Sequence, residues 1–155
     1  MTKVAYVHVG LSSFVRKDIA ILEKEFDLQI FHFDLSRKSA LPLTFLKALL
    51  FQLKALFTCK LTMVQFAGYQ SFVPSLFRFL FRHKLIIVLG GTDTVSFPSI
   101  QYGCFYNKKL AKFTSFSLKH ASLLLPVSES LIEVDYEYTS DDFPKQGYKF
   151  HVPEA

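Results

Sequence analysis

A short apolar run followed by two glycines, a threonine and an aspartate is the part of the sequence best suited to chemistry. Residues 85–89 are all apolar and predict a strand buried on both faces. Gly90 and Gly91 then allow backbone conformations that other residues rarely adopt, and Thr92 and Asp93 follow where the strand ends. Because ligands bind outside the carboxyl ends of strands in open parallel sheets, this loop is the first candidate site. Its two glycines and its threonine are predicted to bind substrate.

Asp93 stands alone as a carboxylate in a basic part of the chain. It is the only acidic residue between Asp34 and Glu129, and that interval carries twelve lysines and arginines. Such an aspartate could accept a hydrogen bond from a substrate hydroxyl or act as a general base, so Asp93 is the predicted catalytic residue. The alternative is an Asx turn, in which the side chain bonds only to nearby backbone.

Two further loops follow predicted strands and could add substrate-binding groups. Gly10, Ser12 and Ser13 lie in the turn that opens the first predicted helix, where backbone N–H groups can hold a phosphate or sugar oxygen. Gln65 and Tyr69 follow the third predicted strand and could offer hydrogen bonds and a stacking face. An ordinary strand-to-helix turn is the alternative for each loop.

Other chemistries lack their signatures in this sequence. The first loop has neither the G-x-G-x-x-G fingerprint of dinucleotide sites nor the G-x-x-x-x-G-K-[ST] pattern of P-loops. The five histidines show no metal-ligand spacing, and neither a Ser-His-Asp nor a Cys-His set is evident, so no metal and no cofactor are predicted. RNP motifs and Cys/His fingers are missing as well, so nucleic acid is not an expected partner.

The apolar residues alternate between the periods of strands and helices. Strand character is found at residues 4–9, 28–33, 61–66, 85–89, 122–127 and 148–152. Helical character is found between them, at residues 14–26, 44–57, 71–82, 106–119 and 128–138. This alternation indicates an α/β fold with a Rossmann-like, doubly wound parallel sheet of about six strands and helices on both faces. One domain spanning residues 1–155 is expected from the length.

The doubly wound fold suggests which loops meet. We expect the strand order 3-2-1-4-5-6, with a crevice between the first and fourth strands. That order would make the loops at residues 10–13 and 90–93 neighbours, although they lie about eighty residues apart. The predicted site would then combine both loops.

Charge and apolar content suggest a cytoplasmic protein at a membrane surface. The net charge is +5 and half of the residues are hydrophobic. Cys59 and Cys104 form no CxxC pair, and the N-terminus has too short an apolar run for a signal peptide. Segments 41–57 and 72–84 are apolar almost all round and carry basic residues, which suits helices lying on an anionic, inner-membrane face. Packing in the core, or against a partner or second domain, is the alternative.

Several segments, taken in order, resemble the N-terminal half of a family 4 retaining glycosyltransferase of the GT-B type. They are residues 4–9 and 12–22 for the first strand and helix, 85–93 for the fourth strand and its G-x-D loop, 121–131 for the V-S-x-x-L segment, and 149–153 for the strand before the linker. The similarity covers nearly the whole chain. Ser122 departs from the family's aspartate, and Glu154 and Ala155 stand where it often has Asn-Gly.

The resemblance implies an enzyme that transfers a sugar from a nucleotide-sugar donor to a hydroxyl of a glycan or lipid-linked acceptor. Residues 1–155 would be its acceptor-binding domain, with Asp93 orienting the acceptor hydroxyl and the turn at Ser12 and Ser13 facing the donor's phosphates. The family's second domain, which binds the donor and carries paired glutamates, is absent from these residues. We therefore expect this half to be inactive alone, with a C-terminal donor domain as its partner.

A stand-alone α/β binding or interaction module without catalysis, such as a flavodoxin-like domain, is the alternative function. A receiver domain is disfavoured, because it needs an acidic pair at the end of the first strand. His8, Val9 and Gly10 stand there instead.

Overall fold

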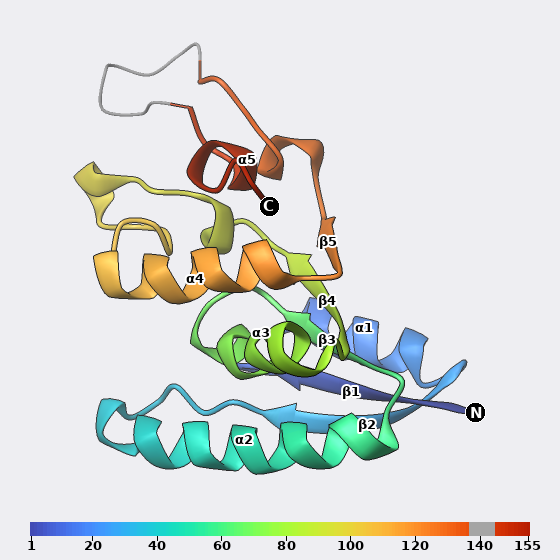
Figure 1. Cartoon of the computed structure of the whole chain (residues 1–155). Helices are drawn as coiled ribbons and strands as arrows, with labels where there is room; N and C mark the ends of the chain where they lie inside the picture. Colours follow the sequence, from blue (N-terminus) through green and yellow to red (C-terminus); the bar gives the residue numbers. More distant parts are fainter. Residues whose placement is uncertain (137–144) are drawn as a thin grey trace.

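Strands and helices alternate along the chain in the computed structural model, which describes residues 1–136 and 145–155 (Figure 1). The strands are β1 (Thr2–His8), β2 (Phe26–His32), β3 (Leu61–Gln65), β4 (Lys84–Leu89) and β5 (Leu123–Pro126). The α-helices are α1 (Ser13–Leu22), α2 (Leu41–Thr58), α3 (Tyr69–Phe81), α4 (Lys108–His120) and α5 (Tyr148–His151). Short 3₁₀ turns are η1 (Lys38–Ala40), η2 (Thr92–Thr94), η3 (Pro98–Ile100) and η4 (Glu129–Leu131).

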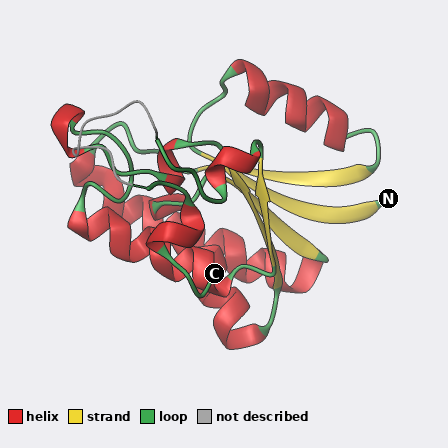
Figure 2. Ribbon diagram, turned by 90° about the horizontal axis from the view of Figure 1, so that it is seen from above, coloured by secondary structure: helices red, strands yellow, loops and turns green. Residues whose placement is uncertain are grey.

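The strands form a parallel sheet in the order β2-β1-β3-β4-β5. In this register Tyr6 of β1 lies opposite Ile30 of β2 and Met63 of β3. Helix α1 lies on one face of the sheet, and α2, α3 and α4 lie side by side on the other (Figures 1 and 2). The predicted α/β fold, with a Rossmann-like doubly wound sheet, is thereby confirmed.

The predicted strand order is wrong, because β3 lies between β1 and β4. Connections between parallel strands are right-handed, so crossovers on opposite faces of a sheet carry the chain in opposite directions along it. Since α1 and α2 lie on opposite faces, β2 and β3 lie on opposite sides of β1. The order therefore reverses between β1 and β3. The sequence predicts a helix between β2 and β3 but does not reveal the face on which it crosses.

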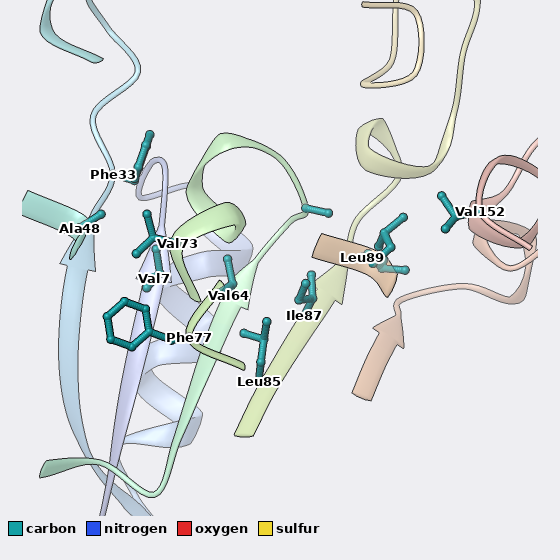
Figure 3. Packing of buried hydrophobic residues seen from close by; sticks show 12 residues of the cluster. Val7, Phe33, Ala48, Val64, Val73, Phe77, Leu85, Ile87, Leu89 and Val152 are labelled. Atoms are coloured by element: carbon teal, nitrogen blue, oxygen red, sulfur yellow. The ribbon is translucent and has the colours of Figure 1, made fainter. Parts of the chain in front are cut away.

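The sixth predicted strand, at residues 148–152, is also wrong. Gly147 has φ +111°, and the helix α5 follows it, in which Val152 N–H donates to the carbonyl of Tyr148 at 2.7 Å. Val152 belongs to the same apolar cluster as Leu89 of β4 (Figure 3). The segment at 148–152 is too short for its pattern of apolar and basic residues to distinguish a helix from a strand.

The predicted helix at 128–138 is replaced, over its described residues, by the single turn η4. Residues 137 and 138 lie outside the described residues. The amide of Val134 donates to the carbonyl of Gln146 at 2.9 Å, and the reverse bond has the same length. This segment therefore pairs with the chain before α5 instead of continuing as a helix.

Aromatic rings join the three helices of the α2–α4 layer. Phe113 of α4 lies 4.8 Å from Phe72 of α3 and 5.1 Å from Tyr69, in edge-to-face geometry. Phe45 of α2 lies 6.2 Å from Phe113. Such pairs contribute about 0.5–1.5 kcal/mol each beyond their buried area. Part of the heavy use of phenylalanine, 18 residues in all, is thus explained by this cluster.

The main apolar core lies between that helix layer and the sheet. Figure 3 shows its strand residues and the helix residues that cover them, namely Val7, Val64, Leu85, Ile87 and Leu89 with Ala48, Val73 and Phe77. Alternate positions of β3 and β4 point into this core, as expected for strands with period two. The packing fixes α3 over the centre of the sheet, and with it the loop that leads from β3 into α3.

Helix α1 leaves part of its own face of the sheet uncovered. Leu123 and Leu125 of β5 are exposed on that side, whereas Leu124 between them packs against the core. A groove of about 280 Å³ runs between α1 and β5. Parallel sheets are usually covered on both faces, so this apolar strip is unusual for a strand of this type.

A buried polar cluster joins α2, β3 and the residue before β4. Gln52 Nε2 donates to Thr62 Oγ1 at 2.8 Å, and His83 Nε2 lies 3.1 Å from the same hydroxyl. Burial lowers the pKa of His83 below its ordinary value, so the fold favours the neutral imidazole. The pKa values of His8 and His151 are lowered by burial as well.

The free energy of unfolding should therefore fall as the pH is lowered from 7.5 to 5.5. The unfolded chain protonates these histidines near their ordinary pKa of 6.5, whereas the folded chain resists protonation. Stability then falls by up to about 1.4 kcal/mol per pH unit for each group. Urea denaturation at both pH values measures this, and His83→Gln should remove its share of the slope. A slope unchanged in His83→Gln would contradict the role of this imidazole.

Candidate functional site

A cavity of about 640 Å³ lies at the carboxyl edge of the sheet, among the loops that follow β1, β2, β3 and β4. It sits where the strand order reverses, which is the usual ligand position in open α/β sheets. Most of its lining is apolar, and a few polar side chains are placed among the apolar ones. The lining residues are Val9, Leu35, Lys38, Leu41, Phe66, Ala67, Gly68, Tyr69, Gln70, Thr92, Asp93, Cys104, Asn107, Lys109 and Leu110. An apolar hollow with a few convergent polar groups is typical of small-molecule sites.

Asp93 ties two of these loops together. Its Oδ1 accepts hydrogen bonds from the backbone N–H groups of Gly90 at 3.1 Å and Gly91 at 3.0 Å, and its Oδ2 accepts one from Ala67 at 3.0 Å. The side chain is 0% exposed. Burial raises the pKa of the Asp93 carboxyl, and the backbone donors counteract that rise. The carboxylate thus fixes the loop after β4 to the loop after β3.

The predicted catalytic role of Asp93 stays a prediction. Its two oxygens are engaged by backbone donors, and no part of the side chain reaches solvent in this conformation. Oδ2 accepts one of the three bonds and retains a lone pair, and the residue lines the cavity. A positioning role for the loops follows directly from this geometry, whereas contact with a substrate hydroxyl requires a ligand deep in the cavity.

Phe66 separates the two loops that the sequence predicted to be neighbours. It follows β3 and has φ +66°, a left-handed conformation that costs an ordinary residue on the order of 1–2 kcal/mol. Its ring lies 5.5 Å from the ring of Phe14 at the start of α1. A Cβ added to Gly90 would come within 1.7 Å of the Phe66 ring, so a larger residue at this position would displace that ring.

The predicted substrate-binding residues are thereby divided. Tyr69 and Thr92 line the cavity with Asp93, and the Thr92 hydroxyl lies 2.8 Å from that of Tyr102. Gly91 has φ +124°, a conformation that favours glycine, and it donates to the Asp93 carboxylate. Gly90 donates to the same carboxylate, so these five residues of the prediction belong to one site.

The remaining predicted residues lie elsewhere. Gln65 lines a smaller cavity on the α1 side, and its Oε1 accepts a hydrogen bond from the buried Tyr6 hydroxyl at 3.2 Å. Gly10, Ser12 and Ser13 are not among the residues that line the large cavity. Since β3 lies between β1 and β4, this loop opens beside Phe66 rather than beside Asp93.

The polar residues near the N-terminal ends of α2 and α4 were not predicted from the sequence. Lys38, Asn107 and Lys109 line the cavity, as does Gln70. Asn107 Oδ1 accepts hydrogen bonds from two backbone N–H groups of the first turn of α4, at 3.0 and 3.2 Å. An asparagine just before a lysine-rich helix is a helix-start signal that could have pointed to this end of α4. Lys38 and Lys109 give this part of the lining positive charge, which favours an anionic group near them.

The long loop between β4 and α4 is firmly held. The buried Gln146 donates to the carbonyl of Ser96 at 2.9 Å and accepts from the Ser96 amide at 2.7 Å. Cys104 closes the loop, since its amide donates to the carbonyl of Thr92 at 2.8 Å. Burial, with a contribution from Asp93, raises the pKa of the Cys104 thiol to about 11, so it is not a nucleophile at neutral pH.

Comparisons of the chain with protein-family models, with curated proteins and with solved structures found no match. Within residues 1–136 and 145–155, no group of three or more His, Cys, Asp or Glu side chains is arranged to hold a metal ion. The choice of function therefore depends on the cavity and on the sequence resemblance.

Replacing Asp93 by asparagine should lower the free energy of unfolding by about 2–4 kcal/mol. The new amide would turn an NH₂ group toward a backbone N–H where a carboxylate oxygen now accepts. Urea denaturation measures the loss. Asp27→Asn is the matched control, because that exposed carboxylate lies 3.9 Å from Lys3 and should change stability by less than about 0.5 kcal/mol. Equal stability of both variants would contradict the positioning role of Asp93.

Proposed function

We propose that this chain is the acceptor-binding half of a glycosyltransferase whose nucleotide-sugar donor is held by a second domain. The acceptor, a glycan or a lipid-linked saccharide, binds in the large cavity with the receiving hydroxyl toward the loop of residues 90–93. The observation that carries this proposal is the cavity itself, which lies at the carboxyl edge beside the loop that resembles the family's G-x-D motif.

The lining of the cavity favours the lipid-linked class of acceptor over a neutral glycan. Val9, Leu35 and Leu41 provide apolar surface, and Lys38 and Lys109 provide positive charge. A ligand that combines an apolar portion with a phosphate or diphosphate complements both features. A neutral sugar chain would offer the two exposed lysines no group of opposite charge.

Within this proposal the residues of the cavity bind and orient rather than form covalent bonds. The ring of Tyr69, which is supported by Phe113 at 5.1 Å, offers a face on which a sugar can stack. Asp93 holds the backbone of residues 90–91 in place, and its remaining lone pair is available to a hydroxyl. Activation of the sugar and departure of the nucleotide belong to the donor domain.

The incompletely covered face of the sheet supports the need for a second domain. Leu123, Leu125 and Val127 present exposed apolar surface beside α1, where a parallel sheet is normally covered. A further domain that packs beside β5 would bury this surface and stand next to the carboxyl edge. The cavity would then lie in the cleft between two domains.

A non-catalytic binding module is the second candidate function, and the burial of Asp93 favours it. A carboxylate that already accepts three backbone hydrogen bonds is better suited to holding loops than to proton transfer. Both candidates require a ligand in the same cavity. They differ in whether transfer of sugar occurs when a donor-binding domain and a nucleotide sugar are supplied.

The test is binding of a short-chain lipid diphosphate saccharide to the chain, measured by calorimetry and by NMR shift changes. Lys109→Ala should weaken binding about tenfold, because it removes a charge-assisted contact to the phosphate. Lys112→Ala is the matched control on α4, since Lys112 is exposed and does not line this cavity. It should leave the affinity unchanged.

The matching free saccharide serves as the second ligand in this test and should bind more weakly than the lipid diphosphate form. Absence of binding by both ligands would refute the acceptor-binding proposal. Equal losses in Lys109→Ala and Lys112→Ala would place the ligand outside the cavity and refute it as well.

A further inference from the structure

Helix α2 presents an apolar stripe to solvent along its whole length. Leu43, Leu46, Leu50, Leu53 and Phe57 recur at helical spacing and are all exposed, with Leu50 at 59% and Phe57 at 80%. The spacing of three and four residues places them on one side of the helix. The stripe runs from Leu43 to Phe57, so at 1.5 Å per residue it is about 21 Å long. We call these five residues the α2 stripe.

The opposite side of α2 packs against the sheet. Thr44, Ala48, Gln52 and Ala55 are its buried residues, and Gln52 is hydrogen-bonded to Thr62 of β3. Among the described residues, Lys38–Thr58 is long and apolar enough to cross a membrane by length and composition alone. Crossing would strip Gln52 from its partner and place two lysines inside the hydrocarbon. The contacts with the sheet therefore favour a helix that lies on a surface.

Positive charge accompanies the stripe. Lys47 and Lys54 are exposed and lie seven residues apart, so both flank the same side of the α2 stripe. Arg37, Lys38 and Lys60 lie at the two ends of the helix, and no acidic residue occurs between Asp34 and Asp93. Long lysine side chains at the rim of an apolar helix face can reach lipid headgroups while the apolar residues enter the acyl region.

The charge also argues against a second copy of this chain as the occupant. A twofold interface through the stripe would face one lysine-flanked helix with another. The segment from 35 to 92 has no carboxylate to pair with these cations. Like charges would then be brought together as the apolar residues are buried. This arrangement favours an anionic partner, and a lipid surface matches its length and its apolar content.

We propose that the α2 stripe docks this protein on an anionic lipid surface, with α2 lying in the plane of the interface and Lys47 and Lys54 at the headgroups. Docking in this orientation has a consequence for the cavity. Lys38 and Leu41, at the start of α2, are part of its lining. The mouth of the cavity would then open at the membrane surface. This consequence rests on the proposed function, whereas the docking itself does not.

The absence of tryptophan from the chain allows the orientation to be tested with single reporters. Leu50→Trp should show a blue-shifted emission on addition of phosphatidylcholine vesicles that contain about 30 mol% phosphatidylglycerol. Lipids brominated in their acyl chains should quench it. Ile21→Trp, at an exposed apolar position of α1 on the other face of the sheet, is the control and should show neither change.

Flotation with the same vesicles tests the role of charge. Lys47→Glu/Lys54→Glu should lower the partition coefficient roughly tenfold or more, as expected when two cations near an anionic surface are reversed. Lys17→Glu/Lys24→Glu makes the same change in net charge on the α1 side, at exposed positions, and should lower binding far less. Vesicles of phosphatidylcholine alone, or high salt, should weaken binding of the unchanged protein.

Three results would overturn the proposal. They are a Leu50→Trp emission that does not respond to anionic vesicles, equal binding losses in the two double-lysine variants, and dimerisation in lipid-free solution that is lost in Leu50→Ser/Phe57→Ser. Light scattering and circular dichroism of each variant show its oligomeric state and its folding. Saccharide binding is measured without vesicles, so failure of docking and failure of the acceptor site are distinguishable.

Discussion

Three backbone N–H groups bound to one buried carboxylate hold the carboxyl edge of the sheet in shape. The Asp93 side chain reaches Gly90 and Gly91 in its own loop and Ala67 in the loop after β3. A buried carboxylate is stable only when hydrogen-bond donors surround it, and these three N–H groups would lack an acceptor without Asp93. The carboxylate and the N–H groups therefore depend on each other. The left-handed backbone of Phe66 next to Ala67 can be tolerated because this connection fixes both neighbouring loops.

The position of β3 decides which residues can share a ligand. Because β3 follows β1 directly in the sheet, the loop carrying Phe66 lies between the turn at 10–13 and the loop at 90–93. The cavity is consequently built from the loops after β3 and β4 and from the first turns of α2 and α4. Its positive charge comes from Lys38 and Lys109, which precede or begin helices and follow no strand directly.

Helix α2 connects this cavity to the outer surface. From sequence alone it is apolar almost all round, and its lysines could belong to any face. In the fold, Gln52 turns inward to Thr62, so the outer side is left with Leu50, Phe57 and the lysines. The buried Ala48 and Ala55 and the stacking of Phe51 on Phe31 of β2 hold the helix in the same orientation. Lys38 and Leu41, at the start of the helix, line the cavity, so the α2 stripe begins beside the candidate site and runs away from it along one element.

The α/β class and the parallel sheet could be predicted from the sequence, because they depend on local periodicity, and glycine and aspartate chemistry pointed to residues 90–93 as a candidate site. It also indicated the unusual apolar content of residues 41–57. The strand order, the short helix at 148–151, the separation of Ser12 and Ser13 from Asp93, and the place of Lys109 in the cavity became visible only in the folded chain. Periodicity fixes which face of an element is apolar, but the side of the sheet on which a crossover passes depends on contacts between residues distant in sequence.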